Sequence, residues 1–257
     1  MALDDWITLS ELELDVVWRA ERLGELPSVI AVPSPGRTHT ERRDLEAVVW
    51  QDLMRQGLAD SPGRIADPLL DRLVTVARAP LRLELRAWCG YELRAILGRS
   101  GRRAAMVVLV GGDVRVLRVP DTRLAATIVS LLPVFPAGPG HSVTVDAASY
   151  AAAADEPEIR NGLARRGLRR DDARTLTEML ADCTGYGQFA AEVSGRDGTV
   201  YRANRVVTSR DSVNGRYQLI RRITPTTDHI TVTPADSAKV ASTVDEILAE
   251  LVRIHRS

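Results

Sequence analysis

The chain has 257 residues, of which 45% are hydrophobic and 26% are charged. This profile is typical of an ordinary globular protein and excludes disordered, collagen-like and disulfide-rich classes. Its 34 basic and 34 acidic residues cancel, so no global field directs it toward nucleic acid or anionic lipid. Lys239 is the only lysine, and this preference for arginine is typical of a high-GC genome.

The sequence predicts a cytoplasmic protein. It has two cysteines, Cys89 and Cys183, which we expect as free thiols in a reducing cytosol, although a pairing between them stays open. The acidic N-terminus lacks the basic start and apolar stretch of a signal peptide. The longest apolar run, Ala104–Val110, is too short to cross a bilayer, so we expect no membrane insertion.

The first half opens with helix signals. Capping boxes at Ser10 and Thr38, each with Glu three residues later, predict helices over 10–24 and 38–57. An Asp-Pro pair, read as N-cap and first helical residue, predicts a third helix over 67–78. A short extended piece is expected at 28–32.

Strand signals follow. Alternation of apolar and polar residues predicts a strand over 81–88, in which Trp88 shares the polar side. Further strands are expected over 91–97, 103–110 and 113–119, the last two joined by a Gly-Gly turn. A closing helix after Pro120 and a Pro/Gly-rich connector, Pro133–Gly140, complete this half.

The second half repeats this order. An extended piece is expected near 143–145, then helices over 156–166 and 171–183 and a final helix after Pro234. Between them the alternating pattern predicts a strand meander over 188–194, 199–208, 216–222 and 229–233, with turns at 195–198 and Asn214-Gly215.

The repeat predicts an α+β fold. We expect a central antiparallel β-sheet made of two pseudo-twofold-related meanders and flanked by helical bundles. We favour a single domain over 1–257, with quasi-repeated halves at about 1–135 and 141–257, because two separate meanders would leave strand edges exposed. Two similar subdomains joined by the connector are the alternative.

Catalytic and metal-binding signals are sparse. The histidines have no metal-ligand spacing, and neither cysteine has a partner nearby. Nucleophile-elbow and phosphate-loop patterns are missing from the sequence. We therefore predict no catalytic, cofactor-binding or metal-binding residue. An enzyme whose site is assembled from distant residues is kept as an alternative. The histidines are His39, His141, His229 and His255.

One local basic cluster runs from Arg160 to Arg174. Such a cluster would contact phosphates in an RNA- or DNA-binding module, which is the less favoured alternative. No aromatic residue is interleaved for base stacking, and Asp171 and Asp172 lie within the cluster. A solvated helix face is the favoured interpretation. The cluster comprises Arg160, Arg165, Arg166, Arg169, Arg170 and Arg174.

Several strings, in their order and spacing, resemble the EspG family, the secretion-associated chaperones of actinobacteria. The resemblance covers nearly the whole chain. The strings are Leu14–Trp18, Gly24–Pro27, Val32–Thr38, Glu41-Arg42, Gly185–Phe189 and Asp211–Tyr217.

This resemblance implies a cytosolic chaperone without enzymatic activity. Such a protein binds the helical tip of a PE–PPE heterodimer, keeps it soluble and directs it to a type VII (ESX) secretion system. It also implies that the partner docks on the sheet and the C-terminal helical bundle. The sequence predicts neither a cofactor nor an oligomeric state.

On this chain the resemblance points to the polar side of the second meander. Phe189, Ala191 and Val193 are expected on one face, so Gln188 and Glu192 face the other. An exposed aromatic on a sheet is a typical anchor for a partner. The predicted partner-binding residues are Trp88, Gln188, Glu192, Arg202, Asn204, Arg216 and Gln218.

Overall fold

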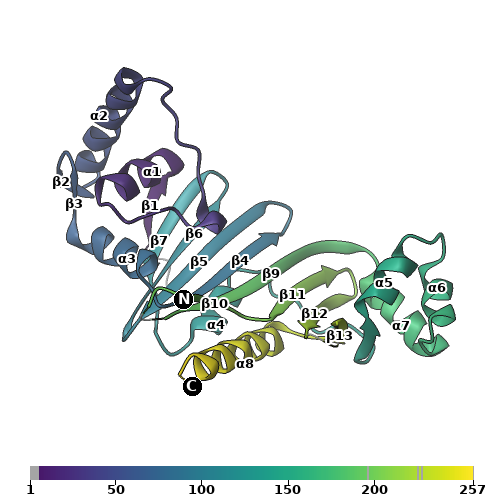
Figure 1. Ribbon diagram of the computed structural model, residues 1–257. Coiled ribbons are helices and arrows are strands. Elements are labelled where there is room, and N and C mark those ends of the chain that lie inside the picture. The colour runs from purple at the N-terminus through teal and green to yellow at the C-terminus, as the bar shows by residue number, and fades with distance from the viewer. Residues whose placement is uncertain (1–5, 196, 225, 227, 257) are drawn as a thin grey trace. The chain divides into compact units, whose positions relative to one another are not determined.

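The computed structural model describes residues 6–195, 197–224, 226 and 228–256, of which residues 255 and 256 are described by their backbone only. It combines helices with a large antiparallel sheet, which confirms the predicted fold class (Figure 1). The chain divides into two compact units. The first takes the residues up to Leu85 with Tyr91–Leu124 and Ser194–Thr199, and the second takes the rest.

The sheet of the first unit is a meander with one added strand. The predicted Gly-Gly turn is confirmed, since Gly111 and Gly112 have φ of 61° and 87°, as this turn requires. The strand order is β1-β7-β6-β5-β4, with bounds β1 Ile7–Ser10, β4 Leu81–Trp88, β5 Glu92–Ser100, β6 Arg103–Val110 and β7 Asp113–Arg118.

Helices and a small hairpin pack with this sheet around one apolar core. Both predicted capping boxes are present, at Ser10 and Thr38. The N-cap of the third helix is Ala66, which makes no side-chain cap, so Asp67 is the first helical residue and not the cap. The elements are α1 Glu11–Ala20, η2 Ser28–Ile30, α2 His39–Arg55, β2 Ala59–Ser61, β3 Arg64–Ile65 and α3 Asp67–Ala77.

From β8 onward, the second unit repeats the order of strand, three α-helices, meander and closing helix that runs from β1 to α4. Its sheet runs β9-β11-β12-β13-β8, with β10 paired to β9. The bounds are α4 Leu124–Val129, β8 Val143–Asp146, α5 Ala147–Ala154, α6 Ile159–Arg165, α7 Arg170–Leu180, β9 Cys183–Ser194, β10 Val200–Arg202, β11 Arg205–Ser212, β12 Gly215–Ile223, β13 Asp228–Pro234 and α8 Ser237–Arg256.

Two sets of helices pack on this sheet. Helices α5 and α7 contact β8 and β13 and form a small core in which Leu176 and Met179 meet Tyr217. Helix α8 contacts β10 and β11. Its predicted apolar stripe is buried, comprising Val244, Ile247, Leu248 and Leu251.

The element order is repeated along the chain, but the first elements of each repeat differ from those expected. The expected extended piece at 28–32 contains the 3-10 helix η2. The strand that precedes the helices is β1 in one unit and β8 in the other, and each pairs antiparallel with the last meander strand. Helix α5 was not predicted, and the strand expected over 199–208 is interrupted at Ala203 and Asn204.

A few predictions lie outside the described residues. These are the acidic N-terminus at 1–5, Arg196 in the turn at 195–198, and the side chain of His255.

Candidate functional site

Strand register decides which residues share a face of the second meander. Gln188 of β9 pairs with Thr208 of β11, which pairs with Leu219 of β12. Residues paired across strands point to the same face, so these three side chains lie together. Their chain neighbours Ser209 and Gln218 pair with each other on the opposite face.

Helix α8 covers the face of Ser209 and Gln218, which we term the closed face. The Thr243 hydroxyl of α8 lies 3.1 Å from Oε1 of Gln218. Arg216 donates from Nη1 to the Ser237 hydroxyl at 2.8 Å. Both strand residues are almost fully buried, at 0% exposure for Arg216 and 1% for Gln218. The closed face is therefore part of the folded interior.

Arg216 is the centre of a buried polar network on the closed face. It donates to both carboxylate oxygens of Asp211, at 2.6 and 2.9 Å, and from Nη2 to the Pro133 carbonyl at 2.6 Å. Its guanidinium lies 5.7 Å from the ring centroid of Phe135. Burial, with the charge of Asp211, raises the pKa of the Cys89 thiol. The network ties the β11–β12 hairpin to the connector and to α8.

The other face, which we term the open face, carries a depression. Its apolar lining is Ala203, Val206, Leu219, Ile223 and Ile230, and its polar lining is Gln188, Asn204, Thr208 and Arg221. Ile223 is 52% exposed, although it is a large apolar residue in a strand. An apolar surface of this kind is typical of a binding site.

The helical bundle α5–α7 adjoins this depression. Leu219 and Ile230 line the depression and also pack against the bundle core, which includes Leu176. Tyr217, two residues before Leu219 on the same face, is buried under the bundle. The open face is therefore a continuous surface made of strands and helices.

An ion pair lies at the depression. Arg221 donates from Nε and Nη2 to the two carboxylate oxygens of Asp228, at 2.9 and 2.6 Å. This hydrogen bonding lowers the pKa of Asp228 and raises the pKa of Arg221. The pair holds one charged group against an otherwise uncharged lining.

Four of the seven predicted partner-binding residues are exposed. Gln188 and Asn204 line the depression, so the structure brings them together. Trp88 is 48% exposed on β4 but does not line the depression. Arg202 is exposed and lies 3.5 Å from Glu192.

The other three were expected on a solvated face and are buried instead. Arg216 and Gln218 belong to the closed face, and Glu192 is only 8% exposed beside Arg202. For Arg216 and Gln218 the reason is the parity of residue numbers across the hairpin. A two-residue loop pairs residue i with residue i+3, so even-numbered residues of β12 share a face with odd-numbered residues of β11. The expected solvent-facing placement of Arg216, Gln218 and Glu192 was therefore wrong.

Sequence reasoning missed the apolar lining of the open face. The signal was present in β12, where Leu219 and Ile220 are adjacent and so point to opposite faces. A strand with one wet face should alternate, whereas adjacent apolar residues indicate that both faces are covered or bind something.

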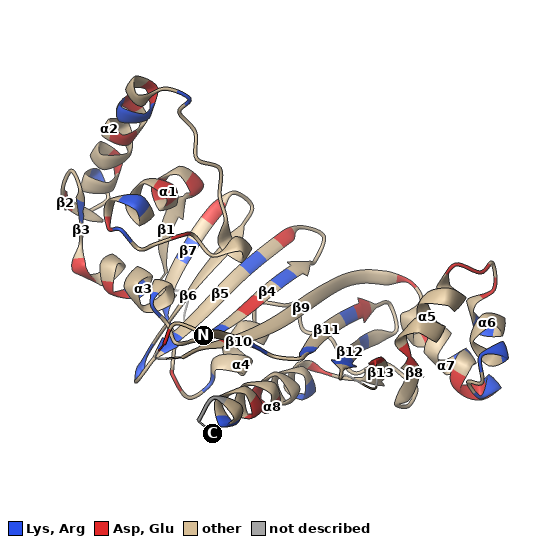
Figure 2. Cartoon of the chain, in the orientation of Figure 1, with Lys and Arg blue, Asp and Glu red and all other residues tan. Residues whose placement is uncertain are grey.

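The basic cluster lies on the bundle. Figure 2 shows basic residues gathered on α6 and α7. Arg165 and Arg166 both pair with Glu156, the latter at 2.5 Å. The hydrogen bond from Arg166 lowers the pKa of Glu156, and the charge of Arg165 adds to this shift. An acidic residue of the same helical bundle therefore neutralises part of the positive charge of the cluster.

Within the described residues, no group of three or more His, Cys, Asp or Glu side chains is arranged to hold a metal ion. Among the histidines, His141 has its Nε2 3.0 Å from Oδ1 of Asp172. Both cysteines are free thiols, Cys89 being half-buried and Cys183 exposed. No described helix is both long and apolar enough to span a membrane.

Comparisons with known proteins agree on one family. The model of the EspG family matches residues 10–246. The fold is similar to that of the Mycobacterium tuberculosis type VII secretion system chaperone EspG5, whose structure was solved in complex with the PE25–PPE41 dimer. That match has a TM-score of 0.73 and 17% identity over 95% of each chain. No curated protein matches significantly.

Proposed function

Because the chain belongs to the EspG family, we propose that it is a cytosolic chaperone for PE–PPE heterodimers. It binds the helical tip of the heterodimer, keeps it soluble and directs it to a type VII secretion system. The similar EspG5 was solved with a PE–PPE dimer, which supports this class of partner.

The observation that carries this proposal is the open face. An apolar depression formed by Val206, Leu219 and Ile223 is exposed beside a helical bundle. An apolar helical tip would aggregate in water unless a complementary surface covered it. The depression and the bundle together offer such a surface, as in other cases where an apolar helix face binds a groove.

Polar groups at the depression provide specificity. Gln188 and Asn204 offer amide donors and acceptors next to the apolar lining. A partner that leaves these amides without hydrogen bonds binds less well, since desolvated polar groups are costly. The identity of these residues therefore selects among helical tips of similar hydrophobicity.

We propose binding and not catalysis as the activity of this surface. The depression is lined by aliphatic side chains with amides, one threonine and one arginine, which is the composition of a contact surface. An enzyme would instead need acids or histidines brought together in a pocket, with shifted pKa values.

We further propose that the two units form a single domain. Both β4 and β9 contribute residues to each unit, with β4 divided after Leu85 and β9 after Val193. Unfolding one unit would therefore break strands of the other. A single unfolding transition in denaturant, detected alike by fluorescence and circular dichroism, is the expected result. Two separate transitions would contradict it.

The chaperone proposal is tested by co-expression. The full-length protein is co-expressed with each PE–PPE pair encoded in the same genome, and the soluble fraction is purified through a tag on the protein. A soluble complex with at least one pair is expected. If the protein is folded and every pair stays insoluble or separate, the proposal is wrong.

A further inference from the structure

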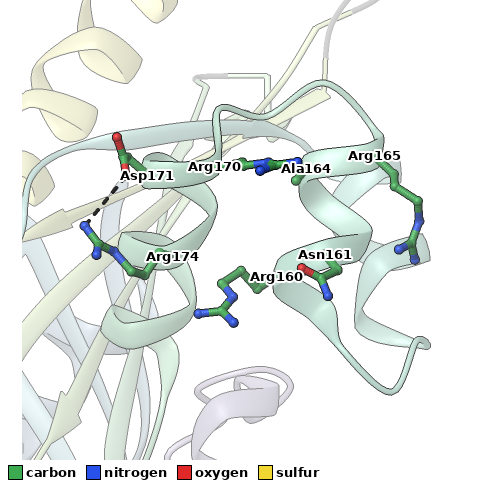
Figure 3. Close-up of a pocket in the computed structure, with 7 residues that line it drawn as sticks. All are labelled: Arg160, Asn161, Ala164, Arg165, Arg170, Asp171 and Arg174. Atoms are coloured by element: carbon green, nitrogen blue, oxygen red, sulfur yellow. Dashed lines mark ion pairs between the residues drawn. The ribbon is translucent and has the colours of Figure 1, made fainter.

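A second hollow lies on the helical bundle, between α6 and α7 (Figure 3). Four of its lining residues are arginines and one is an acid, which gives the lining a net charge of +3. The lining comprises Arg160, Asn161, Ala164, Arg165, Arg170, Asp171 and Arg174.

Helix periodicity places these residues in a stripe along each of the two helices. Arg160 and Ala164 are four residues apart on α6, as are Arg170 and Arg174 on α7, so each pair forms one stripe. The other sides of these helices are packed inward, through Leu163 on α6 and Leu176 on α7. Inward packing therefore directs the basic stripes to solvent.

Not all of the positive charge is neutralised. Arg165 pairs with Glu156, and Arg174 lies 3.7 Å from Asp171, as Figure 3 shows for the second pair. Among the described residues, the side chains of Arg160 and Arg170 have no ion-pair or hydrogen-bond partner. The structure thus presents two free guanidinium groups in one concave site.

Glutamate residues next to the hollow limit the kinds of ligand that it can bind. Glu158 accepts a hydrogen bond from Asn161, and Glu158 and Glu178 line an adjoining hollow together with Arg160. With Asp171, these acids would repel a continuous phosphate backbone. No aromatic residue lines the site for base stacking. The composition favours separate carboxylates on a protein over nucleic acid.

We propose that this hollow binds acidic side chains of the protein partner. The inference rests on the proposed function, since the bundle that carries the hollow adjoins the open face. Guanidinium groups bind carboxylates through two parallel hydrogen bonds, which fixes orientation as well as charge. A partner seated in the depression thus gains a second, charge-selective contact on α6 and α7.

The first test needs no heterodimer. The full-length protein, labelled with nitrogen-15, is titrated at low salt with a short blocked peptide of glutamate and alanine, and with its glutamine counterpart. Amide shifts confined to α6 and α7 are expected with the glutamate peptide alone. The double variant R160E/R170E should bind it about tenfold more weakly.

A matched control comes from adjacent residues. Arg169 and Arg170 are both exposed at the start of α7, but only Arg170 lines the hollow. R169E and R170E change net charge equally, so R170E should weaken peptide binding more than R169E. Equal effects, no peptide binding, or tighter binding of a single-stranded RNA would overturn the inference.

The second test uses a PE–PPE pair that co-purifies with the wild type. R160E/R170E should weaken that complex severalfold and reduce its dependence on salt concentration. An unchanged affinity would overturn the inference and leave the proposed chaperone function intact. Failure of the wild type to bind any pair would count against the proposed function. The peptide titration would still test whether the hollow binds carboxylates.

Discussion

Each face of the second meander departs in one respect from the usual distribution of residue types. The closed face buries charged and amide groups, among them Asp211, Arg216 and Gln218. The open face exposes aliphatic groups, with Ile223 more than half accessible. The difference teaches that residue type alone does not locate a contact surface. Here a buried polar network adds to the apolar core behind the closed face, and exposed apolar groups on the open face are available to a partner.

The largest expected effect concerns the closed face. Replacing Arg216 with Leu leaves the Asp211 carboxylate buried without its partner, which should lower the free energy of unfolding by about 3–5 kcal/mol. Urea denaturation measures this loss. Arg221→Leu on the open face breaks an exposed pair and should cost less than about 1 kcal/mol. Equal losses would contradict the distinction between the faces.

A smaller effect is expected where α8 meets the closed face. Thr243→Val removes a hydroxyl next to the buried amide of Gln218, which should cost about 1–2 kcal/mol in unfolding free energy. Thr231→Val serves as a control, because the Thr231 hydroxyl pairs with Thr144 in an exposed position and water replaces it. If both variants lose the same unfolding free energy, the hydrogen bond between α8 and the closed face is not buried from water.

On the open face the polar contacts should affect binding and not stability. The double variant Q188A/N204A is expected to weaken a PE–PPE complex about threefold to fivefold, with an unchanged denaturation midpoint. Gln51→Ala, an exposed change on α2, should leave the affinity as it is. Titration calorimetry measures both. An unchanged affinity in the double variant would remove these amides from the contact surface.

Much of the fold was predictable from local signals. Capping boxes at Ser10 and Thr38, the Gly111-Gly112 hairpin and the apolar stripe of α8 depend on neighbours in sequence. Short elements were harder. Helix α5 is nearly all alanine and small residues, so it has no period, although its N-cap Asp146 accepts a hydrogen bond from the Ser149 amide.

The candidate site was less predictable, because faces depend on register. The β11–β12 turn lies at Val213-Asn214, one residue before the predicted pair, and the Ser212 hydroxyl accepts from the Asn214 amide there. Gly215 instead permits close approach of the connector, since a Cβ there would lie 2.7 Å from Gly138. The β9–β11 register runs through a long connection and could not be derived locally.

The smallest expected effect is a pH dependence on the open face. Arg221 lowers the pKa of Asp228 below its ordinary value of 3.8, so the pair contributes stability above that pH and loses it as the pH falls. In an NMR titration, Arg221→Leu should raise the pKa of the Asp228 carboxyl toward its ordinary value. An unchanged titration would show that the hydrogen bond is not made.

The most direct measurement compares two exposed isoleucines of the same unit. Ile223 lies in the open-face depression and Ile254 lies on α8, with exposures of 52% and 56%. Ile223→Glu should weaken a PE–PPE complex at least about tenfold by placing a charge in an apolar contact, whereas Ile254→Glu should bind as the wild type does. Wild-type binding by Ile223→Glu, or loss of binding by Ile254→Glu alone, would contradict the assignment of the open face.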